Sequence, residues 1–255
     1  MRIVSWNVNS IRRRLDAVLD FSEDHDIDVV CLQETKIEDQ GFPEDEFGDA
    51  EYDVEYFGQR SYNGVAIATR EVATDVLKNL PSDEPDAQRR LLACTTEGVR
   101  VINVYCPNGQ SLDADAFRFK LDWYRRLREH LETLDPRQPL VLCGDFNICL
   151  EDRDAFYTDG LGERLFTTTA ERDAVRALLD WGLVDAYRTV KPDGDDFTWW
   201  DYRNAGFVRN EGLRIDLFLV TAPVAERLED VVVHRAERGK DNPSDHAPIE
   251  LILRD

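Results

Sequence analysis

A short apolar run that ends in polar side chains is the first feature of this sequence that could do chemistry. Residues 139–147 (PLVLCGDFN) begin with a proline and end in Asp145 and Asn147, which is typical of a buried strand that delivers polar groups to its carboxyl end. Residues two apart on a strand face the same way, so both side chains would point to one face and Phe146 would enter the core. An ordinary turn containing Asp and Asn would explain the pair equally well.

Polar residues also close other expected strands. Residues 2–8 alternate apolar and polar side chains and lead to Asn7 and Asn9, and the apolar run at 28–34 ends in Glu34. Taken alone, a glutamate at a strand end is usually only the first polar residue after the core. Several such residues at one edge of a sheet would form a site.

Two acids in the last fifth of the chain stand in less ordinary places. Asp216 lies within the apolar run at 213–220, where a buried carboxylate is costly unless it is paired. Asp245 and His246 immediately precede the expected last strand at 249–253. These three side chains are therefore candidates for a site.

An aromatic patch at residues 197–203 (FTWWDYR) contains Trp199 and ends in Arg203. Clusters of this kind are more often core than binding surface. The patch precedes the segment that contains Asp216, so it could also lie beside the candidate site.

The remaining pattern predicts hairpins and helices between these strands. Asn63-Gly64 and Glu97-Gly98 are the expected turns of two hairpins, at 52–70 and 89–106. Helices are expected after Ser10 as N-cap, from Phe117 to Leu131, and from a Thr168–Glu171 capping box to Gly182. About a dozen strands with interspersed helices indicate an α/β domain with its site at one edge of the sheets.

Length and composition predict one domain over residues 1–255. The chain is 42% hydrophobic, has 14 Gly and 10 Pro, and contains no linker-like stretch. It begins directly with a strand pattern and has no apolar run of membrane-spanning length, so we expect a cytoplasmic protein without membrane association. Five cysteines, mostly within apolar strand runs, predict no disulfide framework, and Cys143 and Cys149 are too few for a zinc site.

The charge balance is strongly acidic. The sequence has 52 Asp and Glu against 31 Lys and Arg, of which only 5 are Lys, and its net charge is −21. Nucleic-acid-binding proteins usually have the opposite balance. A dispersed acidic surface with little Lys resembles proteins of salt-loving organisms, so the net charge says little about the substrate.

Together, the strand-end residues suggest metal-assisted hydrolysis. The set contains carboxylates, carboxamides, the phenol of Tyr105 and the imidazole of His246, but no Cys or Ser nucleophile and no glycine-rich phosphate loop. Hard oxygen ligands favour Mg²⁺ or Mn²⁺ over zinc. Such a group suits the hydrolysis of a phosphate ester by water, because metal and amides stabilise the developing charge while a base positions the water.

The motifs, in their order along the chain, resemble those of the exonuclease III family of apurinic/apyrimidinic endonucleases. They are WNVN at 6–9, LQETK at 32–36, YCPN at 105–108, GDFN at 144–147, WGLVD at 181–185, LRID at 213–216 and SDHAP at 244–248. The resemblance implies a four-layered sandwich of two mixed β-sheets flanked by helices. It also implies Mg²⁺-dependent incision 5′ of abasic sites in double-stranded DNA, with 3′→5′ exonuclease and 3′-end-cleaning activity, by a monomer.

The same resemblance implies a role for each matching residue. Glu34 would bind the metal with Asn9 and Asp245 nearby, and Mn²⁺ could replace Mg²⁺. The expected catalytic residues are Asn7, Tyr105, Asp145, Asn147, Asp216 and His246. Asp145 would position the water, and Asp216 would orient His246. The expected substrate-binding residues are Trp199, Arg203, Leu213 and Ile215, with Arg203 near the DNA backbone.

Two positions depart from some family members, and two other functions stay open. Asn9 replaces an Asp and Leu213 replaces an aromatic residue, which leaves the number of metals and the preference for an abasic site open. A related phosphoesterase acting on inositol phosphates or sphingomyelin would keep Glu34, Asp145, Asn147 and His246. A non-catalytic nucleic-acid-binding module would be expected to lack at least one catalytic residue, and none is missing.

Overall fold

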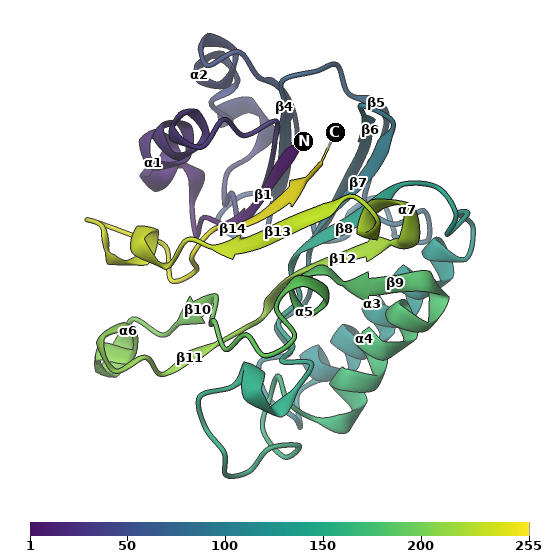
Figure 1. Ribbon diagram of the computed structural model, residues 1–255, viewed down its shortest axis with the longest axis vertical. Coiled ribbons are helices and arrows are strands. Elements are labelled where there is room, and N and C mark those ends of the chain that lie inside the picture. Colours follow the sequence, from purple (N-terminus) through teal and green to yellow (C-terminus); the bar gives the residue numbers. More distant parts are fainter. Residues whose placement is uncertain (255) are drawn as a thin grey trace.

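Two six-stranded β-sheets lie face to face, with helices on the outer side of each, in the computed structural model, which describes residues 1–254 (Figure 1). The first sheet has the order β13 (Leu228–Val233), β14 (Ile249–Leu253), β1 (Arg2–Asn7), β2 (Val29–Gln33), β4 (Val65–Thr69) and β3 (Asp53–Phe57). The second has the order β5 (Thr74–Lys78), β6 (Leu91–Thr96), β7 (Val99–Tyr105), β8 (Leu140–Asp145), β12 (Asp216–Thr221) and β9 (Leu183–Asp185). A two-stranded ribbon joins β10 (Trp199–Trp200) to β11 (Gly212–Leu213).

Both sheets are mixed. β1 pairs with β2 and β7 with β8 in parallel, whereas the other neighbours are antiparallel. The longer helices are α1 (Ile11–Asp24), α3 (Asp115–Leu131) and α4 (Thr169–Gly182). Shorter ones are α2 (Glu44–Asp49), α5 (Ala186–Val190), α6 (Gly206–Arg209) and α7 (Ala222–Ala225). The expected four-layered sandwich of two mixed sheets flanked by helices is confirmed.

Three apolar layers hold the sandwich together. Strand residues such as Cys31 and Val101 fill the space between the sheets. Phe21 of α1 packs with Trp6 on the outer face of the first sheet, and Trp123 of α3 packs on the outer face of the second. All five cysteines are free and buried, and Cys31, Cys94 and Cys143 lie within strands. Among residues 1–254, no helix is both long and apolar enough to span a membrane.

Several local expectations are confirmed. The two hairpins form as β3–β4 and β6–β7, with Asn63 and Gly64 both at positive φ in the first connection. Thr168 caps α4, its hydroxyl accepting from the Glu171 backbone while the Glu171 carboxylate accepts from the Thr168 backbone.

Ser10 does precede α1, but the expectation that its side chain caps the helix is wrong, because Ser10 adopts φ 95° and makes no capping hydrogen bond.

The expectation of one continuous strand over residues 213–220 is also wrong. The chain leaves β11 after Leu213 and enters β12 at Asp216. Asp216 is therefore the first residue of a strand rather than an interior one. Arg214 interrupts the pattern because its buried guanidinium turns to Asp154 and Asp185.

Candidate active site

The candidate residues lie where strands of both sheets end at one edge. Asn7 ends β1, Glu34 follows β2, and Asp145 ends β8. Asp216 pairs with Asp145 across the antiparallel β12–β8 ladder. Immediately before Asp145, Gly144 is required, because a Cβ at this position would lie 1.9 Å from the carbonyl oxygen of Val104. The close approach of β8 to β7 thus fixes the position of the Asp145 carboxylate.

Asn7 joins the ends of the two sheets. Its Nδ2 donates to Glu34 Oε1 at 2.8 Å and to Asp145 Oδ2 at 3.0 Å. Asn7 is completely buried, so few other positions are open to its carboxamide. This amide fixes the separation of two carboxylates that come from different sheets.

His246 lies between two aspartates. Its Nδ1 is 2.9 Å from Asp216 Oδ2, and its Nε2 is 3.7 Å from Asp145 Oδ2. Asp216 is held in turn by Thr198, whose hydroxyl donates to Asp216 Oδ2 at 2.6 Å and accepts from the Asp216 backbone N–H at 3.1 Å. The imidazole is thereby oriented with Nε2 toward Asp145.

The carboxylates outnumber the cations in this buried group, and this imbalance shifts the pKa values of its members. Burial, with Asp216 and Glu34, raises the pKa of Asp145 to about 7, although His246 and the Asn7 hydrogen bond oppose the shift. Burial lowers the pKa of His246, but Asp216 and Asp145 outweigh it and raise that pKa to about 10. Burial also raises the pKa of Tyr105 well above its usual value. Perturbed groups gathered in this way are typical of functional sites.

Asn147 reaches the site through a turn and not through an extended strand. Its φ is 52°, and its backbone N–H donates to Asp145 Oδ1 at 2.9 Å, which is the hydrogen bond of an Asx turn. Its Nδ2 donates to the Cys106 carbonyl and its Oδ1 accepts from Asn108 Nδ2 at 3.1 Å. The prediction that Asp145 and Asn147 share a strand face is therefore wrong, and the alternative of a turn containing both residues is confirmed. Phe146 is buried as expected.

Glu34, Asp145 and His246 offer ligand atoms that all lie within 4.8 Å of one another. The Glu34 carboxylate faces the Lys36 ammonium, with Oε2 and Nζ 2.6 Å apart, so a single positive charge already lies at this place. The carboxylates of Glu34 and Asp145 supply oxygen ligands of the kind that hard divalent cations prefer. The residues present thus fit a divalent metal ion.

Asn9 and Asp245 lie beside this cluster and are bound to their neighbours. Asn9 Nδ2 donates to Asp245 Oδ1 at 2.9 Å, and Asn9 Oδ1 accepts from Lys36 Nζ at 2.6 Å. Asp245 Oδ2 accepts from the indole N–H of Trp199 at 3.0 Å. Both oxygens of Asp245 therefore accept hydrogen bonds, and Asp245 also orients the Trp199 ring.

The expected substrate-binding residues fall into two environments. Leu213 and Ile215 are buried in a small apolar cluster with Cys149 and Ala155, against which Trp199 packs. Arg203 is exposed, and its guanidinium bonds both carboxylate oxygens of Asp201. The structure brings Trp199 to the site through Asp245, whereas Arg203 lies on the surface.

Two buried cations near the site were not predicted. Lys120 of α3 donates from Nζ to the carbonyl of Asn147 at 2.8 Å and forms a buried ion pair with Glu171. Arg90 donates to the carbonyl of Tyr105 at 3.0 Å, and its guanidinium lies 4.7 Å from the centre of the Tyr105 ring. Lys120 stands at a helical position where the pattern predicts an apolar side chain, and this was the one signal that could have marked it as a buried cation. Arg90 immediately precedes β6 and has no distinctive sequence signal.

Comparison with known proteins gives a consistent family. Residues 4–246 match the model of the endonuclease/exonuclease/phosphatase family. Exodeoxyribonuclease III of Haemophilus influenzae is 36% identical, with 98% of each chain covered. The structure of a 3′ phosphatase from Neisseria bound to product DNA hairpin superposes with a TM-score of 0.98 at 41% identity, and that of an AP endonuclease from Archaeoglobus fulgidus with 0.96 at 36%, each covering 100% of both chains. The chain therefore belongs to the endonuclease/exonuclease/phosphatase family, among its exodeoxyribonuclease III and AP endonuclease members.

Proposed function

We propose that this protein is a DNA repair nuclease that hydrolyses the phosphodiester 5′ of abasic sites and also acts at 3′ ends as exonuclease and 3′-end-cleaning enzyme. The observation that carries the proposal is the placement of Asp145. Its carboxylate lies between the Asn7 amide and the His246 imidazole, at the edge where Glu34 offers a metal ligand. The names of the relatives support DNA as the substrate.

In this proposal Asp145 positions or deprotonates the attacking water. With a pKa raised to about 7, it would be a better proton acceptor than an ordinary aspartate while still largely ionised above neutral pH. His246, held by Asp216, would face the scissile phosphate with a positive charge. Asn147 and Tyr105 would contact the phosphate oxygens, where N–H and O–H donors stabilise the charge that develops during hydrolysis.

The proposed metal is Mg²⁺, with Mn²⁺ as a possible substitute, held chiefly by Glu34. Bound there, the cation would supply Lewis-acid stabilisation of the phosphate oxygens. Asn9 and Asp245 would bind it only if their present hydrogen bonds to each other, to Lys36 and to Trp199 were exchanged. We therefore assign these two residues a supporting place in the metal site.

The abasic sugar would contact the apolar cluster that contains Leu213 and Ile215, beside Trp199. Leu213 would give this wall less area than an aromatic side chain, which favours tolerance of several 3′-end substrates. Arg203 would lie near the DNA backbone once its guanidinium exchanged Asp201 for phosphate.

We also propose that residues 1–255 form a single domain, active as a cytoplasmic monomer, in an organism adapted to high salt. The core between the sheets supports one domain, because it combines Ile3 near one end of the chain with Leu253 near the other. The net charge of −21 supports the salt adaptation. Screening of acidic repulsion predicts a higher free energy of unfolding in molar KCl than in dilute buffer, measured by urea titration. Equal or lower stability in KCl would contradict the salt adaptation.

The test of function is a gel with end-labelled duplexes, one with a single abasic-site analogue and one intact, in Mg²⁺ or in EDTA. Incision at the analogue in Mg²⁺ alone is expected. Glu34→Gln should lose most of this activity and need more Mg²⁺, because a ligand charge is removed. Glu44→Gln, an exposed acid at the start of α2, is the matched control. Equal Mg²⁺ dependence in wild type and Glu34→Gln would remove Glu34 from the metal site, and failure to cleave either duplex would contradict the function.

A further inference from the structure

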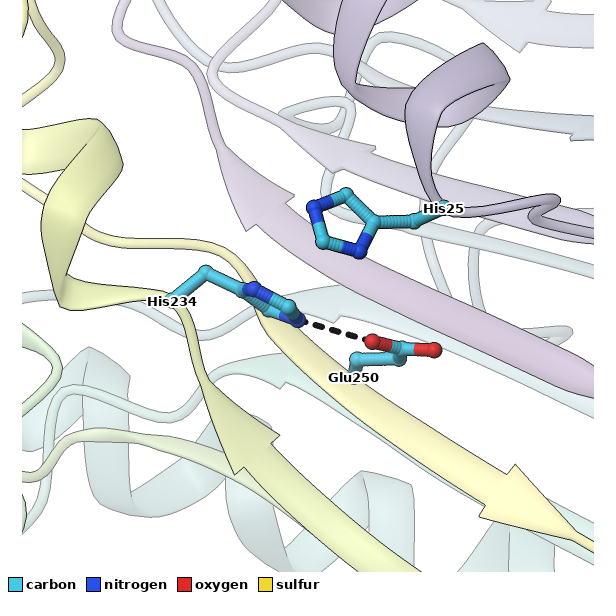
Figure 2. A group of neighbouring side chains, drawn as sticks. All are labelled: His25, His234 and Glu250. Carbon is cyan, nitrogen blue, oxygen red and sulfur yellow. Dashed lines mark hydrogen bonds and ion pairs between the residues drawn. The ribbon is translucent and has the colours of Figure 1, made fainter.

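A second group of metal-ligating side chains lies away from the active-site edge, on the outer face of the first sheet. His25, His234 and Glu250 offer ligand atoms that all lie within 4.8 Å of one another. His25 follows the last residue of α1, His234 follows β13, and Glu250 is on β14. Figure 2 shows the His25 ring next to the His234–Glu250 pair, with the three side chains pointing toward one another.

Glu250 is fixed by two basic side chains. Arg2 Nε donates to Glu250 Oε1 at 2.6 Å, while Oε2 lies 2.7 Å from His234 Nε2. The carboxylate is almost completely buried, and the His234 backbone is tied to the neighbouring strand through the Pro248 carbonyl. One oxygen is thus oriented by Arg2 and the other is presented to the imidazole, which is the outer support that metal-binding carboxylates commonly have.

His25 is the member of the group without a protein hydrogen bond. Within residues 1–254, neither of its ring nitrogens has a protein hydrogen-bond partner, although the ring is half-buried. Its ring centre lies 4.5 Å from that of His234 and 4.3 Å from that of Phe21. Packing therefore holds this imidazole beside the pair and leaves its lone pair available.

The spacing and the surroundings suit one cation. Ligands at about 2.0–2.2 Å from one tetrahedral ion lie roughly 3.3–3.5 Å apart, so small side-chain rotations would bring the three groups onto it. His25 caps the carboxyl end of α1, where the helix dipole favours positive charge. Two imidazoles and one carboxylate select zinc-class ions over Mg²⁺, which prefers oxygen ligands.

We propose that His25, His234 and Glu250 bind a divalent transition-metal ion of the zinc class, with a fourth position open to water. The ion would connect the end of α1 to β13 and β14, segments that are more than 200 residues apart in the chain. It would stabilise the folded state, because an ion that binds only the native chain shifts the unfolding equilibrium. The site is chemically distinct from the oxygen-rich group at Glu34, so one protein would hold two different metals.

The test measures zinc bound to the untagged chain after EDTA treatment and desalting, by equilibrium dialysis in excess Mg²⁺ followed by elemental analysis. Wild type is expected to hold one Zn²⁺ more than His25→Gln, or to bind it at least tenfold more tightly, and Zn²⁺ should raise the unfolding temperature of wild type but not of this variant. His130→Gln, a partly buried histidine of α3 outside both clusters, is the control and should behave as wild type.

A further pair of variants separates this site from the active site. His246→Asn should keep the additional Zn²⁺, whereas His234→Gln should lose it. If His234→Gln fails to fold, His25→Gln carries the test, because His25 lies at a helix end without a side-chain hydrogen bond. Equal zinc content and affinity in wild type and His25→Gln, or loss of zinc only in His246→Asn, would overturn the proposal.

Discussion

Arg214 and Asp216 lie two residues apart in the chain but belong to two different buried groups of charged side chains. Arg214 donates from Nε to Asp154 Oδ1 at 2.7 Å and from a terminal nitrogen to Asp185 Oδ2 at 2.8 Å. Asp216 instead holds His246, which faces a second carboxylate at Asp145. Both groups are almost completely buried, yet their charges are balanced differently.

The difference is visible in the proton affinities of the two central aspartates. Burial alone would raise the pKa of Asp154, but the guanidinium groups of Arg214 and Arg188 lower it. Burial also raises the pKa of Asp145, and there the Asp216 and Glu34 carboxylates add to the shift, which reaches about 7. Paired charges thus keep one aspartate ionised, while neighbouring acids make the other a ready proton acceptor.

The Arg214 group stabilises the fold, whereas the Asp145 group serves the chemistry of the site. The Arg214 group connects the short 3-10 helix that ends at Asp154, the end of β9 and the entry to β12, so it fixes where Asp216 begins its strand. The Asp145 group leaves carboxylates without matching cations, which costs stability unless a cation or phosphate balances them. Imbalance, rather than burial alone, marks the active site.

The largest effect is expected from breaking the unbalanced group. His246→Ala and Asp216→Ala should each lower turnover on abasic duplex by at least about 100-fold, because the oriented positive charge that faces the phosphate would be lost. The double variant should be little worse than either single variant, since residues that act as a unit are strongly non-additive. Single-turnover cleavage in saturating Mg²⁺ measures all three.

His130→Ala provides the control, because this histidine lies on α3 outside the group. It should cleave at the wild-type rate. If the losses of the two single variants multiplied in the double variant, His246 and Asp216 would act independently, and the orienting role of Asp216 would be wrong.

The next effect concerns the balanced group and should appear in stability. Asp154→Asn leaves Arg214 with one buried carboxylate fewer, and removal of one partner from a buried ion pair typically costs about 3–5 kcal/mol. Urea unfolding should show this loss. Asp152→Asn, which removes an exposed partner of Arg172, should cost no more than about 1 kcal/mol.

The stability difference between wild type and Asp154→Asn should depend on pH. The pKa of Asp154 is lowered in the folded chain, so its contribution to stability is complete above the ordinary aspartate value and is lost as pH falls through the folded value. The stability difference between wild type and Asp154→Asn should therefore persist from pH 7 to pH 5 and shrink only below about pH 4. A stability difference that already shrank between pH 7 and pH 5 would mean that Arg214 and Arg188 do not keep the Asp154 carboxylate ionised.

The sequence predicted the convergence of the site better than its local geometry. Asn7, Glu34 and Asp145 lie at strand ends. Because parallel strands bring such ends to one edge of a sheet, the approach of these three side chains could be expected from the sequence pattern alone. The sequence left a turn at Asp145 and Asn147 open as an alternative, but it could not show that the Asn147 side chain bonds to Cys106 and Asn108, which come from another strand end. The same holds for the break before Asp216, which depends on Asp154 and Asp185 in distant segments.

Long-range partners also explain what sequence patterns missed elsewhere. The buried Lys120 ammonium is paired with Glu171 of α4 and bonds to the Asn147 carbonyl, and a helical pattern contains no information about either partner. His25 and His234 are ordinary polar residues at the ends of two elements until folding places their rings 4.5 Å apart. Periodicity predicts which elements form, whereas the side chains that meet across elements need the fold.

The smallest effect concerns surface charge, which salt can alter while it leaves both buried groups intact. At 1 M salt the Debye length is about 3 Å, against about 10 Å at 0.1 M, and each neutralised phosphate contributes a slope of roughly −0.9 to log K against log salt.

Arg203 is exposed and already paired with Asp201, so its contribution to DNA binding should be small and should shrink as KCl rises. Trp199 packs on the apolar cluster and is fixed by Asp245, so stacking worth about 1–3 kcal/mol should persist. Fluorescence anisotropy with abasic duplex in EDTA, from low to molar KCl, compares Trp199→Ala and Arg203→Ala. The penalty of the arginine variant should fall while that of the tryptophan variant stays constant, and a parallel decline of both would contradict the idea that recognition in high salt depends on apolar contact.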